Sequence, residues 1–117
     1  MRFACCVEGD MIKRADPFYK LPRWLRLRRA ALGRDGWQCC ECRRFGKRTQ
    51  AATVHHIFPR GEYPEYQWDG WNLASLCDAC HDAMHDRTTN ALTEKGVDLL
   101  KRTARRRGME LPLRYRA

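Results

Sequence analysis

The sequence has no long hydrophobic run. None of its 117 residues belongs to a stretch of about 18 consecutive apolar residues, the length that a membrane-spanning helix requires. The first twenty residues also carry Glu8, Asp10 and Asp16 where the apolar segment of a signal peptide would lie. We therefore expect neither a membrane span nor a signal peptide, and we expect a cytoplasmic protein.

Acidic residues are scarce relative to basic ones. The chain has 14 Asp and Glu residues against 23 Lys and Arg residues, which gives a formal net charge of +9. On a chain of about one domain's length, this charge predicts a polyanionic partner, and nucleic acid is the simplest one. Internal repeats are absent, and only the basic C-terminal tail is of low complexity.

The positive charge is concentrated toward the two ends of the chain. Between Val54 and Glu94, seven acidic residues face only Arg60 and Arg87, and this segment contains all four histidines. The pattern predicts that the central segment contains a metal site. The basic segments on either side would bind the phosphate backbone of a nucleic acid. For any single arginine, a solvated surface position is the simpler interpretation.

We divide the chain into three segments: an N-terminal arm (1–22), a central domain (23–90) and a basic C-terminal helix and tail (91–117). Apolar residues at helical spacing predict a helix at 22–32. Residues 78–87 lack Gly and Pro and predict a second helix, and the β-branched segment 53–57 predicts a strand. Thr93 is the predicted N-cap of a last helix, which ends before Gly108.

The seven cysteines are an odd number, and disulfides are uncommon in a reducing compartment, so we interpret these residues first as metal ligands. Two C-x2-C pairs, Cys39 with Cys42 and Cys77 with Cys80, are typical of a tetrahedral zinc site, because each short spacer turns the chain so that both sulfurs face one ion. We predict one structural Zn²⁺ that joins the first helix to the histidine-bearing segment. The remaining cysteines are assigned no role: Cys5, Cys6 and Cys40.

The histidines predict a second metal site. His81 and His85 lie four residues apart, which places both imidazoles on one face of the predicted helix. Either His55 or His56 can supply a third ligand, and the positions left open are typical of a catalytic metal. Adjacent strand residues point to opposite faces, so one of this pair would bind the ion and the other would be free to act as a general base.

Together these residues resemble the HNH endonuclease family, and in particular its ββα-metal members with a four-cysteine zinc, found in small bacteriophage and bacterial proteins. The resemblance extends from about residue 18 to residue 87. Its motifs are Phe18-Tyr19, Trp24, Arg34-Asp35-Gly36-Trp37-Gln38-Cys39, Val54-His55-His56-Ile57 with Pro59, Asn72-Leu73, and Leu76-Cys77-Asp78-Ala79-Cys80-His81 with His85. The implied fold class is α+β, a small zinc-stabilised nuclease core with flanking helices.

The resemblance also implies the roles of individual residues. His56 would be the general base, and Asn72, counted with it among the catalytic residues, would tie the loop together and orient it. The implied ligands of one catalytic divalent cation, Mg²⁺, Mn²⁺, Ni²⁺ or Zn²⁺, are His55, His81 and His85. The implied reaction is hydrolysis of DNA to 5′-phosphate and 3′-hydroxyl ends. The candidate DNA-binding residues are Arg26, Arg29, Arg43, Arg44 and Arg60.

Partners follow from the same resemblance. The predicted partner is DNA, bound mainly through its phosphates, and a phage terminase or another DNA-processing protein is a further candidate. The implied location is the cytoplasm of a bacterial cell or a phage-infected host. RNA as the substrate, and nicking versus double-strand cleavage, stay open.

The alternative function is a non-catalytic, zinc-dependent DNA-binding accessory protein of a packaging or repair complex. In its C2H2 form, Cys39 and Cys42 would bind zinc with His81 and His85. The gap between these two pairs far exceeds the roughly twelve residues of such a finger, and the other cysteine pair would be unexplained.

Overall fold

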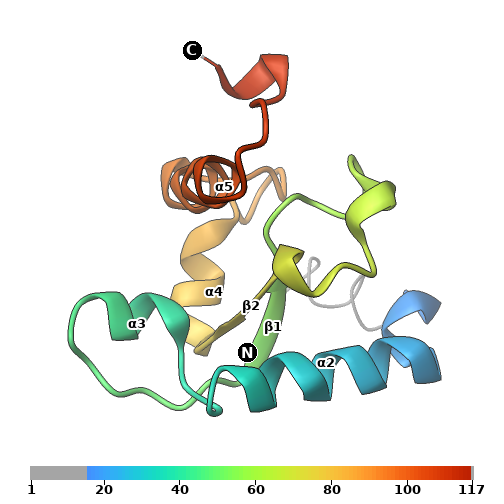
Figure 1. The fold of residues 1–117 in the computed structure, drawn as a ribbon, viewed down its shortest axis with the longest axis vertical. Helices are drawn as coiled ribbons and strands as arrows, with labels where there is room; N and C mark the ends of the chain where they lie inside the picture. The colour runs from blue at the N-terminus through green and yellow to red at the C-terminus, as the bar shows by residue number, and fades with distance from the viewer. Residues whose placement is uncertain (1–15, 117) are drawn as a thin grey trace.

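The structure is a computed structural model and describes residues 16–116. Most of the predicted arm, including Cys5 and Cys6, lies outside this range. Four α-helices surround a sheet of two strands: α2 (Pro22–Arg34), α3 (Cys40–Arg44), β1 (Thr53–His56), β2 (Leu73–Leu76), α4 (Asp78–Met84) and α5 (Glu94–Arg107). In the view of Figure 1, α2 runs along the bottom and α5 lies near the top, with α4 and the sheet between them. This small mixed architecture confirms the predicted α+β class.

The two strands are antiparallel, and their register places His55 opposite Ala74 and His56 opposite Leu73. Because side chains alternate along a strand, the two histidines of β1 point to opposite faces. His56 lies against the apolar cluster built on α2, where it stacks on Trp24. His55 lies on the face covered by α4, next to His81. The described helices include none that is both long and apolar enough to cross a membrane.

Helix α2 confirms the helix predicted from the apolar spacing. It begins with Pro22 at its first position, where a missing backbone N–H has no cost. Its buried face consists of Trp24, Ala31 and Leu32. Phe18, in the segment that we assigned to the arm, is also buried and packs against Trp24 with ring centroids 5.5 Å apart. The segment before α2 therefore contributes to the core.

Helix α4 is shorter than predicted. It ends at Met84, and His85 is already extended, with φ −127° and ψ 143°. The segment after it turns back, so that His85 forms a β-bridge with Leu92 and the N–H of Thr93 donates to the carbonyl of Met84. That returning segment satisfies the last carbonyls of α4, which explains the early end. The prediction that His81 and His85 share one helical face is therefore wrong, although the tertiary fold still brings them together.

Helix α5 confirms the predicted caps. The Thr93 hydroxyl accepts a hydrogen bond from the N–H of Gly96, and Gly108 ends the helix in the left-handed conformation, with φ 68°. Gly96 is required by packing, because a Cβ at this position would lie 2.5 Å from the carbonyl oxygen of Met84. Glycine lowers the stability of the helix itself, but its missing side chain allows α5 to lie close to the end of α4.

A Gly96→Ala variant is expected to unfold at a lower denaturant concentration than the wild type. Overpacking against backbone costs about 1–3 kcal/mol, which outweighs the gain of about 1 kcal/mol from the helix preference of alanine. The matched control is Gly33→Ala in α2, where a Cβ meets nothing within 4 Å. It should change stability by between zero and a gain of about 1 kcal/mol. Equal effects of both substitutions in urea unfolding would contradict the packing argument.

The outer edge of β2 is covered by the side chains of Arg34 and Asp35, a role that the sequence motif did not disclose. The Arg34 guanidinium donates to the carbonyls of Gly70 and Leu73, each at 2.8 Å, and the Asp35 carboxylate accepts from the N–H of Ser75 at 3.3 Å. Burial opposes ionisation of Asp35, but the hydrogen bonds and charge of Arg34 and the hydrogen bond from Ser75 lower its pKa overall. These two residues occupy the place of a third strand.

Candidate active site

Four cysteines from two distant segments meet beside the sheet. The sulfur atoms of Cys39, Cys42, Cys77 and Cys80 all lie within 4.8 Å of one another. Cys39 precedes α3 and accepts a hydrogen bond from the N–H of Cys42, while Cys77 precedes α4. The structure thus joins the two C-x2-C pairs and leaves out Cys40, whose thiol pKa is raised to about 11, mainly by burial.

The spacing of these sulfurs fits zinc. A tetrahedral ion with bonds of about 2.3 Å places its sulfur ligands about 3.8 Å apart. The Cys42 sulfur lies 3.9 Å from that of Cys77 and 3.8 Å from that of Cys80. Because His81 and His85 belong to a separate cluster, the arrangement does not support the C2H2 alternative.

The second cluster consists of His55, His81 and His85. One ring nitrogen of each lies within 4.8 Å of the others. The three come from three backbone environments: a strand, a helix and the extended residue after that helix. Imidazole nitrogens are ligands for Zn²⁺, Ni²⁺ and related divalent ions, so the donor set suits such a cation. The described residues offer no cysteine or carboxylate to this cluster.

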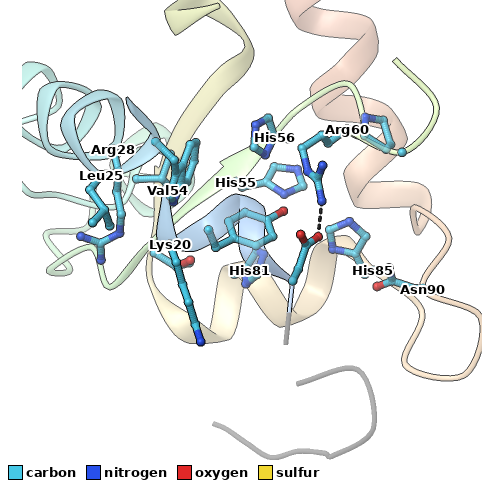
Figure 2. Close-up of a pocket in the computed structure, with 16 residues that line it drawn as sticks. Lys20, Leu25, Arg28, Val54, His55, His56, Arg60, His81, His85 and Asn90 are labelled. Carbon is cyan, nitrogen blue, oxygen red and sulfur yellow. Dashed lines mark hydrogen bonds and ion pairs between the residues drawn. The ribbon is translucent and has the colours of Figure 1, made fainter. Parts of the chain in front are cut away.

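The three histidines line a cleft of about 650 Å³ that also contains His56 and Arg60. Figure 2 shows the rings of His55, His81 and His85 turned toward one another, with the Arg60 side chain beside them and His56 above His55. The cleft lies between the N-terminal half of α2, strand β1 and α4. It brings the four predicted site histidines to one place.

His56 is held from two sides. Its ring stacks on Trp24 with centroids 5.1 Å apart and an interplanar angle of 23°. Its Nε2 lies 3.1 Å from the carbonyl oxygen of Gln67. A carbonyl only accepts, so this hydrogen bond requires the proton on Nε2 and leaves Nδ1 as the basic nitrogen. Burial lowers the pKa of His56, and the charge of Arg60 adds to this effect, so the neutral ring is favoured.

Asn72 is fully buried, so it has no surface for a substrate. Its side-chain oxygen accepts from the N–H of Phe58 at 2.7 Å, and its amide donates to the carbonyls of Phe58 and Tyr66, each at 3.2 Å. These bonds join the residues after β1 to the loop that carries Gln67. Asn72 is thus connected to His56 only indirectly, through the backbone around Phe58 and the loop of Tyr66 and Gln67.

An Asn72→Asp variant is expected to lose about 2–4 kcal/mol of unfolding free energy, because a buried carboxylate oxygen would face two carbonyls that now accept N–H bonds. Urea unfolding measures the loss. Asn90→Asp makes the same chemical change at an exposed position and should stay within about 0.5 kcal/mol of the wild type. A similar small change for Asn72→Asp would show that its amide bonds are not needed.

Arg60 forms part of the cleft wall. Its guanidinium lies 4.2 Å from the ring centre of Phe18 and forms an ion pair with Asp16. Its Nε is buried and has no hydrogen-bond partner within residues 16–116. The Arg60 side chain as a whole is 26% exposed in the cleft wall, and a guanidinium in that place is suited to an acceptor such as a phosphate oxygen.

The other candidate DNA-binding arginines do not line this cleft. Arg26 and Arg29 are exposed on α2. Arg43 donates to the carbonyl of Asp35 at 2.6 Å, and Arg44 pairs with Glu41 at 3.2 Å. The structure therefore brings only Arg60 of the five to the histidines.

Comparisons with known proteins match this geometry. The family model described as HNH endonuclease matches residues 39–87, a segment that contains both cysteine pairs and all four histidines. The crystal structure of an HNH endonuclease from the deep-sea thermophilic bacteriophage GVE2, with a manganese ion, is similar with a TM-score of 0.56. The two chains are 36% identical, and the match covers 63% of this chain and 80% of that one. No curated protein matches the chain significantly.

Proposed function

The chain belongs to the HNH endonuclease family and is a nuclease, and on this premise we propose that it hydrolyses phosphodiester bonds of DNA with the help of one divalent cation. The proposed products carry 5′-phosphate and 3′-hydroxyl ends. The observation that carries this proposal is a single cleft that holds three clustered histidines, a fourth histidine whose pKa is lowered by burial, and Arg60. The four-cysteine cluster would hold a structural zinc, separate from the reaction.

In the proposed reaction, His56 is the general base. Its Nδ1 accepts a proton from the attacking water, while its Nε2 keeps the hydrogen bond to the carbonyl of Gln67. Trp24 and the backbone of Gln67 restrict the ring to one orientation, so the base does not have to be ordered when the substrate binds. Asn72 supports this arrangement through the loop.

The phosphate requires positive charge, because its oxygens repel the attacking oxygen and the alkoxide is a poor leaving group. Arg60, which lines the cleft with a partly exposed side chain, would donate guanidinium N–H groups to a phosphate oxygen. When held by His55, His81 and His85, a divalent cation supplies Lewis-acid stabilisation of the charge on the phosphate and on the departing 3′ oxygen.

The test is cleavage of supercoiled plasmid by the purified protein with Mg²⁺, Mn²⁺, Ni²⁺ or Zn²⁺ added in turn. We expect cleavage that depends on the added cation and stops with a chelator. The products should be ligatable, because ligation needs a 5′-phosphate and a 3′-hydroxyl. The ratio of nicked to linear plasmid separates nicking from double-strand cleavage.

A matched RNA substrate distinguishes the alternatives. Cleavage of RNA but not DNA would contradict the proposed substrate. DNA binding without cleavage under every cation would favour the accessory-protein alternative or a requirement for a partner, such as a terminase.

A further inference from the structure

A second cleft, of about 640 Å³, lies on the other side of the sheet. Its lining shares no residue with that of the histidine cleft. The histidine cleft contains residues of β1, whereas the second cleft contains Leu73 and Ala74 of β2. Because the sheet formed by residues 16–116 consists of these two strands, the clefts lie at its opposite edges. The second cleft is bounded by the end of α2, by α3 and by α5.

The second cleft is strongly basic. Its charged lining residues are Arg34, Arg44, Arg102, Arg106 and Arg107, with Asp35 and Glu41. Five guanidinium groups against two carboxylates leave a formal charge of +3 in one concave surface.

Internal contacts hold several of these arginines in place. Glu41 pairs with Arg44 and with Arg102, each at 3.2 Å, and thereby connects α3 to α5. Arg107 lies over the ring of Trp71, 4.3 Å from its centre. Because these side chains are already ordered, they lose less conformational entropy when a ligand binds. Arg106, one turn after Arg102, makes no ion pair within the described part of the chain, so its charge is available.

We propose that this cleft binds the phosphate backbone of a second segment of duplex DNA, an inference that rests on DNA being the substrate. Guanidinium groups are suited to phosphate because they offer paired N–H donors. Because the two clefts share no lining residue and lie at opposite edges of the sheet, we assign the second cleft to a segment other than the one at the histidines. The enzyme would thus hold two DNA segments at once, with Arg44 and Arg106 at the second and Arg60 at the first.

The experiment measures capture of a second duplex by the full-length, zinc-loaded protein without an added catalytic cation. One short duplex is immobilised, and a fluorescent duplex is added with the protein between 50 and 200 mM salt. Over this range each phosphate contact changes the affinity by about 3.5-fold. The wild type should retain the fluorescent duplex. Arg106→Glu should reduce the log–log salt slope of this retention by at least about 1 and weaken retention at least about eightfold at 0.1 M salt, because it removes one phosphate contact and adds a negative charge.

The matched control is Arg105→Glu, which makes the same charge change on the same helix at an exposed residue outside the cleft. It should retain the duplex with the wild-type salt slope. Equal losses in both variants would overturn the inference, because they would show a general charge effect. Light scattering of the free protein tests whether the protein is a dimer. A dimer could hold the two duplexes with one histidine cleft each, and this result would also overturn the inference.

Plasmid cleavage by the same wild-type preparation separates the two proposals. Cleavage without capture of a second duplex would overturn the second site and leave the proposed function standing. Neither cleavage nor any DNA binding would overturn both. Capture of a polyglutamate peptide in place of the duplex, lost in Arg106→Glu, would assign the cleft to an acidic protein and overturn the DNA proposal.

Discussion

A His56→Ala variant should cleave DNA about 10²–10⁴-fold more slowly than the wild type, the usual contribution of a positioned general base. The loss should fall on kcat, because Arg60 and the histidines that would hold the cation are unchanged, so the groups that bind the phosphate stay in place. Single-turnover cleavage of a labelled duplex at saturating protein measures the chemical step without interference from product release.

Two controls make this result specific to the base. The variant should still contain one tightly bound zinc, because the four cysteines lie in the other cluster. It should also bind the same duplex with wild-type affinity in the absence of a catalytic cation. A rate within tenfold of the wild type would show that another group activates the water.

A Cys77→Ser variant should lose the tightly bound zinc and fail to fold at 25 °C. Structural zinc in small domains contributes an apparent free energy of about 10 kcal/mol or more, as large as the whole unfolding free energy of a typical domain, about 5–15 kcal/mol. The four cysteines join α3 to the start of α4, and the apolar core that surrounds them is that of a small domain. Zinc content and far-UV circular dichroism check the two parts of this prediction.

The control for this prediction is Cys40→Ser, the neighbour of Cys39 in sequence. Cys40 is partly buried but lies outside the cysteine cluster. We expect this variant to keep its zinc and its helical spectrum. If Cys77→Ser kept a folded spectrum without zinc, the metal would be dispensable for the fold, and its role would have to lie elsewhere.

The histidines show how far local patterns reach. The alternation of a strand is enough to separate His55 from His56, because it depends only on the backbone of two adjacent residues. The pairing of His81 with His85 was predicted for the wrong reason. The i, i+4 spacing implied a continuous helix, but the segment that returns from Leu92 to Thr93 satisfies the carbonyls at the end of α4 and stops it at Met84.

The arginines show where local patterns stop. Arg43 and Arg44 are among the DNA-binding candidates of the sequence. The fold instead turns α3 toward α5, where Glu41 pairs with Arg44 and Arg102. Arg34 and Asp35 were visible only as part of a motif, and their role at the edge of β2 depends on contacts with residues about 40 positions away.

The sequence by itself determined the two cysteine pairs, the start of α2, both limits of α5, and which histidines are candidate ligands, because caps, short spacers and periodicity act over a few neighbouring residues. Helix α2 continues two residues beyond its predicted end, to Arg34. Only the tertiary structure decided which side chains share a cleft. It placed Trp24 of α2 against His56 and brought His85, which lies beyond the end of α4, to His55 and His81. It also separated the basic residues between two edges of the sheet. The physical reason is that such contacts depend on how distant elements pack to bury their apolar faces, which spacing along the chain does not specify.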